Sequence, residues 1–115
     1  MILVDPLSGR VPEARWSPSP HFNARPAGLS PELLVVHSIS LPPGRFGGPY
    51  IDQLFHGTLN LLADRSFQSL QGVTVSAHLL IRRNGALVQY VSLNDRAWHA
   101  GESRFNGREN CNDFS

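Results

Sequence analysis

Five histidines and one cysteine are the side chains in this sequence best suited to binding a metal or moving a proton. His37 lies in the apolar run 33–39, where a buried neutral imidazole needs a metal or a hydrogen-bond partner. A satisfied core histidine is the commoner outcome for such a position, and His78 presents the same alternatives. His21 and His56 lie in polar or loop contexts, so we expect them on the surface.

No local metal-binding motif such as HExxH or CxxC is present, so a metal site would have to combine distant positions. Cys111 lies in an Asn-rich stretch without an activating neighbour, and we interpret it as an ordinary thiol. No serine or cysteine triad can be identified from the spacing.

The segment 95–101 places Arg96, Trp98 and His99 among small residues. An aromatic face beside an imidazole and a guanidinium suits stacking on a sugar or holding a peptide. The alternative interpretation is that Trp98 simply packs its own loop.

These residues need elements to position them. The run 33–39 predicts a strand buried on both faces, with His37 near its carboxyl end. Proline and glycine at 42–44 and 47–49 predict a loop after it, followed by a helix over 50–55. A second short helix is predicted over 64–70.

The clearest local pattern is two apolar runs, 77–83 and 86–91, joined by Asn84-Gly85. This pattern predicts an antiparallel hairpin closed by a two-residue type I′ turn. Six prolines between Pro6 and Pro31 predict an extended lead without a central strand. Residues 92–115 carry no sustained period, and we expect an irregular connection there.

Length and composition predict one globular domain, with residues 1–31 as the lead and 32–115 as its core. A net charge of +1 with scattered arginines argues against nucleic acid as a partner. No apolar run could span a membrane, and the start of the chain lacks a basic leader, so we expect a cytoplasmic protein. We also expect a monomer.

Three blocks of the sequence, "LLVVHSISLPPGRFGGPYIDQLF", "VSAHLLIRRNGALVQYV" and "DRAWHAGESRFNGRENCNDFS", carry a family resemblance. They closely resemble the anhydro-muropeptide amidases of bacterial cell-wall recycling. These enzymes belong to the N-acetylmuramoyl-L-alanine amidase family 2, with phage lysozyme-type amidases and peptidoglycan recognition proteins. The likeness runs from about Ser17 to Ser115 in order and with nearly matching spacing.

The resemblance implies an α/β (α+β) fold in which helices flank a mixed β-sheet that is incomplete at its C-terminal end. It implies a Zn²⁺ cofactor with His37 as one ligand, and a small muropeptide as substrate. Trp98, His99, Ser38 and Arg96 would bind this substrate, whereas His78 would not be a zinc ligand. The reaction implied is hydrolysis of the amide between 1,6-anhydro-N-acetylmuramic acid and L-alanine. Its loss would raise β-lactamase expression in bacteria that have this regulation.

The family's second His ligand, Asp ligand, general-base Glu and a Lys lie beyond the block that ends at Ser115. We therefore expect residues 1–115 alone to be inactive and poorly folded, with catalytic groups supplied by a longer chain. Ser38 and Asn110 stand where relatives often carry Asn and Arg. Two alternatives remain: a non-catalytic muropeptide-binding module, and a secreted wall-lytic amidase, which the missing signal sequence disfavours.

Overall fold

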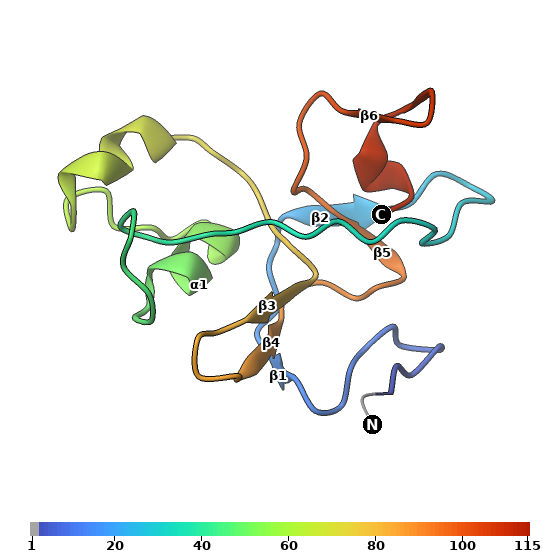
Figure 1. The fold of residues 1–115 in the computed structure, drawn as a ribbon, viewed down its shortest axis with the longest axis horizontal. Coiled ribbons are helices and arrows are strands. Elements are labelled where there is room, and N and C mark those ends of the chain that lie inside the picture. The colour runs from blue at the N-terminus through green and yellow to red at the C-terminus, as the bar shows by residue number, and fades with distance from the viewer. Residues whose placement is uncertain (1–2) are drawn as a thin grey trace.

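A computed structural model describes residues 3–115, which form short strands and helices around a small core (Figure 1). The helices are the α-helix α1 (Tyr50–His56) and the 3₁₀ helices η1 (Arg65–Leu70) and η2 (Cys111–Asp113). The strands are β1 (Arg15–Trp16), β2 (Phe22–Ala24), β3 (Leu79–Ile81), β4 (Leu87–Gln89), β5 (Asp95–Ala97), β6 (Arg104–Phe105) and β7 (Arg108–Glu109).

The predicted hairpin is confirmed: β3 and β4 pair antiparallel, with Leu80 opposite Val88. Its predicted type I′ turn is wrong. Gly85 has a φ of +86°, whereas Asn84 is not among the residues with positive φ. The amide of Gly85 donates to the carbonyl of Arg82, and the amide of Arg82 donates to the carbonyl of Ala86. The loop therefore has three residues, with glycine in the left-handed position that follows a type I turn.

The proline-rich lead is extended, as predicted, but it also contributes two edge strands. β1 adds parallel to β4, giving a mixed three-stranded sheet in the order β1-β4-β3. β2 pairs antiparallel with β5. Each strand fits between two prolines, Pro12 and Pro18 for β1 and Pro20 and Pro26 for β2. The predicted fold class, α+β with a mixed sheet and flanking helices, is confirmed.

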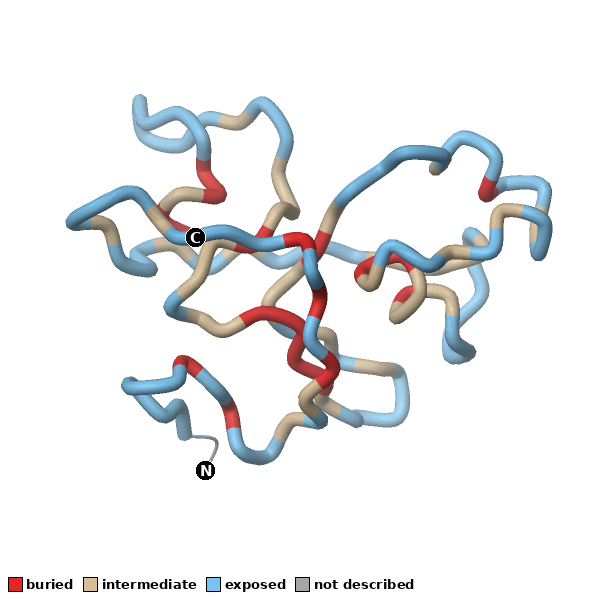
Figure 2. The backbone as a smooth tube through the Cα atoms, turned by 180° about the vertical axis from the view of Figure 1, so that it is seen from behind, coloured by how far each residue is buried: buried red, intermediate tan, exposed pale blue. Residues whose placement is uncertain are grey.

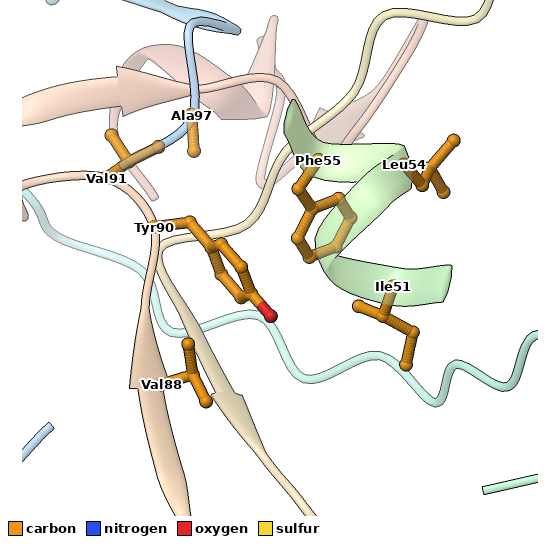
Figure 3. Close-up of a cluster of buried hydrophobic side chains, with 7 residues drawn as sticks. All are labelled: Ile51, Leu54, Phe55, Val88, Tyr90, Val91 and Ala97. Atoms are coloured by element: carbon orange, nitrogen blue, oxygen red, sulfur yellow. The ribbon is translucent and has the colours of Figure 1, made fainter. Parts of the chain in front are cut away.

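The main core forms where α1 packs on the hairpin sheet (Figure 3). Its buried members are Ile51, Leu54, Phe55, Val88, Tyr90, Val91 and Ala97. The rings of Phe55 and Tyr90 meet edge to face, 4.8 Å between centroids. Helix α1 follows Pro49 as predicted and ends at Gly57, whose φ of +76° suits a left-handed cap. The second predicted helix is present as η1, with Asp64 accepting a capping bond from the amide of Ser66.

Segment 33–39 departs most from the prediction, because it forms no strand. It runs extended across the molecule (Figure 1) but pairs with no strand among residues 3–115. Leu34 and Val36 are 87% and 84% exposed, and His37 is exposed as well. A buried strand requires neighbours on both edges and both faces. The described residues place no strand at either edge, and only part of the segment, such as Ile39, packs against the core.

Residues 92–115 are more ordered than predicted, because they contain β5, the β6–β7 hairpin and η2. Buried residues gather near the centre of the molecule, while long exposed segments reach outward (Figure 2). The radius of gyration is 14.5 Å, against about 13 Å expected for a compact domain of this length. Among residues 3–115 no helix is both long and apolar enough to cross a lipid bilayer.

Buried polar side chains fasten the lead to the core. Gln89 is 1% exposed, and its side chain accepts from the amide of Val11 and donates to the carbonyls of Gly9 and Val91. Asp52 on α1 accepts from the Tyr90 hydroxyl and pairs with Arg15 at 3.1 Å and with Arg82 at 3.3 Å. One amide and one carboxylate thus connect the lead, the helix and the hairpin.

Replacing Gln89 with Leu keeps the volume but leaves the buried Val11 amide and the Val91 carbonyl without partners, and it takes one of two donors from the Gly9 carbonyl. We expect Gln89→Leu to lower the free energy of unfolding by about 2–4 kcal/mol, measured by urea denaturation. Hydrogen exchange at the Val11 amide should accelerate. The control is Gln68→Leu at an exposed position, where we expect little change. Equal stability of the two variants would contradict the assigned role of Gln89.

Burial raises the pKa of Asp52, but hydrogen bonds from Tyr90 and Arg15 outweigh it, so the pKa lies below its ordinary value. Such a carboxyl stabilises the fold above its unfolded pKa of about 3.9 and loses this effect as pH falls through the folded pKa. We expect Asp52→Asn to cost about 1–2 kcal/mol at neutral pH, and the difference to shrink towards about pH 2.

Urea denaturation at both pH values measures this difference. Glu13→Gln, which removes an exposed carboxylate, is the control and should show neither effect. A constant difference between wild type and Asp52→Asn across the pH range would refute the ion-pair account.

Candidate functional site

Three side chains from distant parts of the sequence form a connected chain of hydrogen bonds. Nε2 of His37 lies 3.1 Å from Nδ1 of His99, and Nε2 of His99 lies 2.7 Å from Oγ of Ser115. The two imidazole rings meet edge to face, 5.2 Å between centroids. The structure therefore joins the exposed His37 to the loop that the sequence predicted as a binding loop.

His99 is held mainly through its backbone. Oδ1 of Asn112, a buried residue of η2, accepts from the amides of His99 and Ala100, and its Nδ2 donates to the carbonyl of Ala100. Burial, with His37 and His78 nearby, lowers the pKa of His99 to about 4, so this ring is neutral at pH 7. It can accept one hydrogen bond and donate another.

His78 immediately precedes β3, and its Nε2 lies 2.9 Å from the carbonyl of Asp95. Its ring centroid is 6.5 Å from that of His99. Burial lowers the pKa of His78, so this imidazole is also neutral. Because its Nε2 is hydrogen-bonded to a backbone carbonyl, we interpret His78 as a structural neighbour of His99.

Arg25 fastens the turn that carries the site. Its guanidinium donates to the carbonyls of Leu93 (3.0 Å), Asp113 (3.1 Å) and Asn112 (3.3 Å). Its Nε is the one fully buried side-chain nitrogen or oxygen in residues 3–115 without a partner. Arg25 therefore connects the lead to both ends of segment 93–113.

Segment 33–39 reaches the site through the same turn. The amides of Glu32 and Leu33 both donate to the carbonyl of Phe114, at 2.7 and 3.1 Å. Arg108 forms an ion pair with Glu32 beside them. These contacts bring His37 alongside His99.

Trp98 stacks on His21, with ring planes 11° apart and centroids separated by 5.9 Å. The indole Nε1 donates to the side chain of Asn23. The prediction that His21 lies on the surface is wrong: it is 8% exposed, and its Nδ1 lies 2.9 Å from the carbonyl of Val75. A stacking partner and a backbone acceptor make burial of this imidazole favourable. His56 is half-buried at the end of α1, with Nε2 2.9 Å from Oγ of Ser17.

The other predicted binding residues lie around this cluster. Ser38 is exposed directly after His37, and Arg96 pairs through Nε with Asp113 at 2.7 Å. Cys111 is a free, buried thiol at the start of η2. A hollow of about 260 Å³ is lined by His21, by Leu54 and by residues between 57 and 74. Neither His37 nor His99 lines it.

The part of the chain that the structure describes contains no group of three His, Cys, Asp or Glu side chains placed to hold a metal ion. His37 is exposed and engages only Nε2 in a hydrogen bond, so it fits one position of a metal site. It does not make a site by itself, because a catalytic zinc typically has three protein ligands.

Residues 27–115 match the family model described as N-acetylmuramoyl-L-alanine amidase. The chain belongs to this amidase family. It is 57% identical over 96% of its length to the 1,6-anhydro-N-acetylmuramyl-L-alanine amidase AmpD of Salmonella typhimurium. It is 59% identical over 89% of its length to the Escherichia coli enzyme of the same name. The chain spans 59% and 56% of these two relatives, so it corresponds to a part of their length.

Two solved structures of the amidase family are also similar. A crystal structure of an AmpD selenomethionine derivative matches 98% of the chain with a TM-score of 0.94 at 56% identity. The solution structure of Citrobacter freundii AmpD matches 99% of the chain, at the same identity, with a TM-score of 0.61. The chain covers 62% and 60% of those two proteins.

Sequence reasoning identified His37, His99 and Trp98 but missed Arg25, Asn112 and Ser115. The first three are chemically distinctive within their segments. The last three are polar residues in loops, whose importance depends on which backbone groups they face. Nothing in their local pattern indicates that.

We expect Arg25→Met to lower the free energy of unfolding by about 2 kcal/mol, because three carbonyls lose a charged donor. Arg25→Lys should cost less than Met but still destabilise, since an ammonium cannot reproduce the planar array of donors. Chemical denaturation measures both. Arg83→Met, at an exposed arginine over Phe46, is the control and should be nearly neutral. A neutral Arg25→Met would contradict the fastening role.

Proposed function

We propose that the complete protein hydrolyses the amide between 1,6-anhydro-N-acetylmuramic acid and L-alanine in muropeptides during cell-wall recycling. The observation that carries this proposal is the 57% identity, across 96% of the chain, to amidases named for that bond. The contact between His37 and His99, 62 residues apart in sequence, supports it by bringing the family's site residues together. We further propose a cytoplasmic location and action as a monomer.

We propose Zn²⁺ as the cofactor of the complete protein, with His37 as one ligand. Bound zinc would polarise the scissile carbonyl and activate a water molecule. The described residues supply one of the required donors, so the others and a general base have to come from elsewhere in the complete protein. For the same reason we propose that residues 1–115 alone do not catalyse the reaction.

We propose that Trp98, His99, Ser38 and Arg96 bind the muropeptide. His21 supports one face of the Trp98 ring, which leaves the indole rigid and suited to contact with a sugar face. Arg96 uses Nε for Asp113 and Nη1 for the Asn23 side chain, and its Nη2 is suited to contact with a carboxylate of the peptide. Ser38 places a small hydroxyl next to His37.

A non-catalytic muropeptide-binding module is the competing proposal. It would use the same tryptophan, histidine and arginine without a metal. The exposed position of His37 favours the enzyme, because its Nδ1, which has no hydrogen-bond partner among the described residues, is accessible to a metal. Zinc stoichiometry separates the two proposals.

We expect His37→Ala in the full-length protein to abolish bound zinc and release of L-alanyl peptide from anhydro-muropeptide. Elemental analysis and chromatography of the products measure the two effects. His56→Gln is the control, because His56 contacts Ser17 on another part of the molecule and should retain both properties. Residues 1–115 alone should show no release. Full activity and full zinc content in His37→Ala would refute the enzyme proposal.

A further inference from the structure

We infer that Ser115 is a positioning residue that acts through His99 to set the tautomer and orientation of His37. The inference starts from two distances, 3.1 Å between the imidazoles and 2.7 Å from His99 to the Ser115 hydroxyl. The inference rests on the proposed amidase function and adds a role for Ser115 to it.

The hydrogen-bond chain can run in two directions. In one, the serine hydroxyl donates to Nε2 of His99, Nδ1–H of His99 donates to Nε2 of His37, and the proton of His37 sits on Nδ1. A neutral His37 in that state has no free lone pair for a metal. In the other, Nε2–H of His37 donates to Nδ1 of His99, and Nε2–H of His99 donates to Ser115. The second direction leaves Nδ1 of His37 with an open lone pair.

The two ends of this chain differ in how firmly they are held. His37 is exposed on a segment with no strand partner among the described residues, and its side chain forms a hydrogen bond to His99. His99 is pinned through its backbone by Asn112. Ser115 is 9% exposed, and its amide donates to the carbonyl of Cys111. The rigid turn therefore orients the exposed ring.

This arrangement matches a general requirement of histidine ligands. A metal-binding histidine usually donates its second ring N–H to a fixed acceptor, which selects the tautomer and holds the ring plane. The acceptor here is another imidazole, whose own proton must then find an acceptor at its far nitrogen. The Ser115 hydroxyl lies at that nitrogen and can accept its proton, so removing it removes the partner that stabilises this tautomer of His99.

The test is ¹⁵N NMR of the imidazole rings in the metal-free full-length protein at about pH 8, above the ordinary histidine pKa. We expect both His37 and His99 to carry their proton on Nε2. In Ser115→Ala, the His99 signals should shift towards a mixture of tautomers, and Ser115→Thr should restore the wild-type pattern. Nδ1–H tautomers in the wild-type protein would overturn the inference even if Ser115→Ala failed to fold.

Ser103→Ala is the matched control. The Ser103 hydroxyl accepts from the amide of Cys111 and so supports the same turn without touching an imidazole. We expect this variant to keep the wild-type tautomers. If Ser103→Ala and Ser115→Ala change the His99 signals equally, Ser115 has a general structural role and the inference is wrong.

Zinc affinity of the same full-length variants links the inference to function. Loss of the group to which a ligating histidine donates typically weakens metal binding about 10–100-fold. Ser115 lies one hydrogen bond beyond that group, so we expect a loss of about 10-fold, at the lower end of this range, in Ser115→Ala and recovery in Ser115→Thr. Unchanged affinity in Ser115→Ala, with His37→Ala still abolishing binding, would refute the inference and leave the amidase proposal intact. Wild-type activity in His37→Ala would refute the amidase proposal. The NMR comparison of the wild-type protein with Ser115→Ala would still test the role of Ser115.

Discussion

Two hydrogen bonds to the carbonyl of Phe114 hold the site together. They come from the amides of Glu32 and Leu33 and bring the segment that carries His37 beside the turn that carries Ser115. Without them, nothing else in the backbone of 33–39 would restrain that segment, because it joins no sheet among residues 3–115. The position of His37 therefore depends on the order of a turn almost eighty residues later in the sequence.

That turn is ordered by polar groups rather than by a large core. Asn112 and Arg25 satisfy carbonyls and amides that would otherwise be unpaired, and Gln89 does the same for the Val11 amide in the lead. A small domain with short strands buries limited apolar surface, so satisfied buried polar groups become a large share of what specifies its conformation. The site lies on this polar framework, while the apolar cluster of α1 and the hairpin lies beside it.

Local elements were predicted best where one residue type decides the geometry. Pro49 marks the start of α1, and glycine at 85 marks the hairpin. Even there the turn type was wrong, because Asn84 did not adopt the positive φ that the pair Asn-Gly favours. The strand over 33–39 was wrong for a different reason: an apolar run indicates a need for burial, but a strand forms only where another strand pairs with its edge, and none does here. Leu34 and Val36 remain exposed.

By itself the sequence determined the family, the hairpin, the helix after Pro49 and the candidate residues His37, Trp98 and His99. These depend on local residue types or on motifs that can be read along the chain. Only the tertiary structure decided that His37 meets His99, that His99 meets Ser115, and that Trp98 stacks on a buried His21. Such contacts join residues that are 16 to 77 positions apart in the sequence. They form only when distant backbone donors and acceptors have found their hydrogen-bond partners, and no local pattern encodes that pairing.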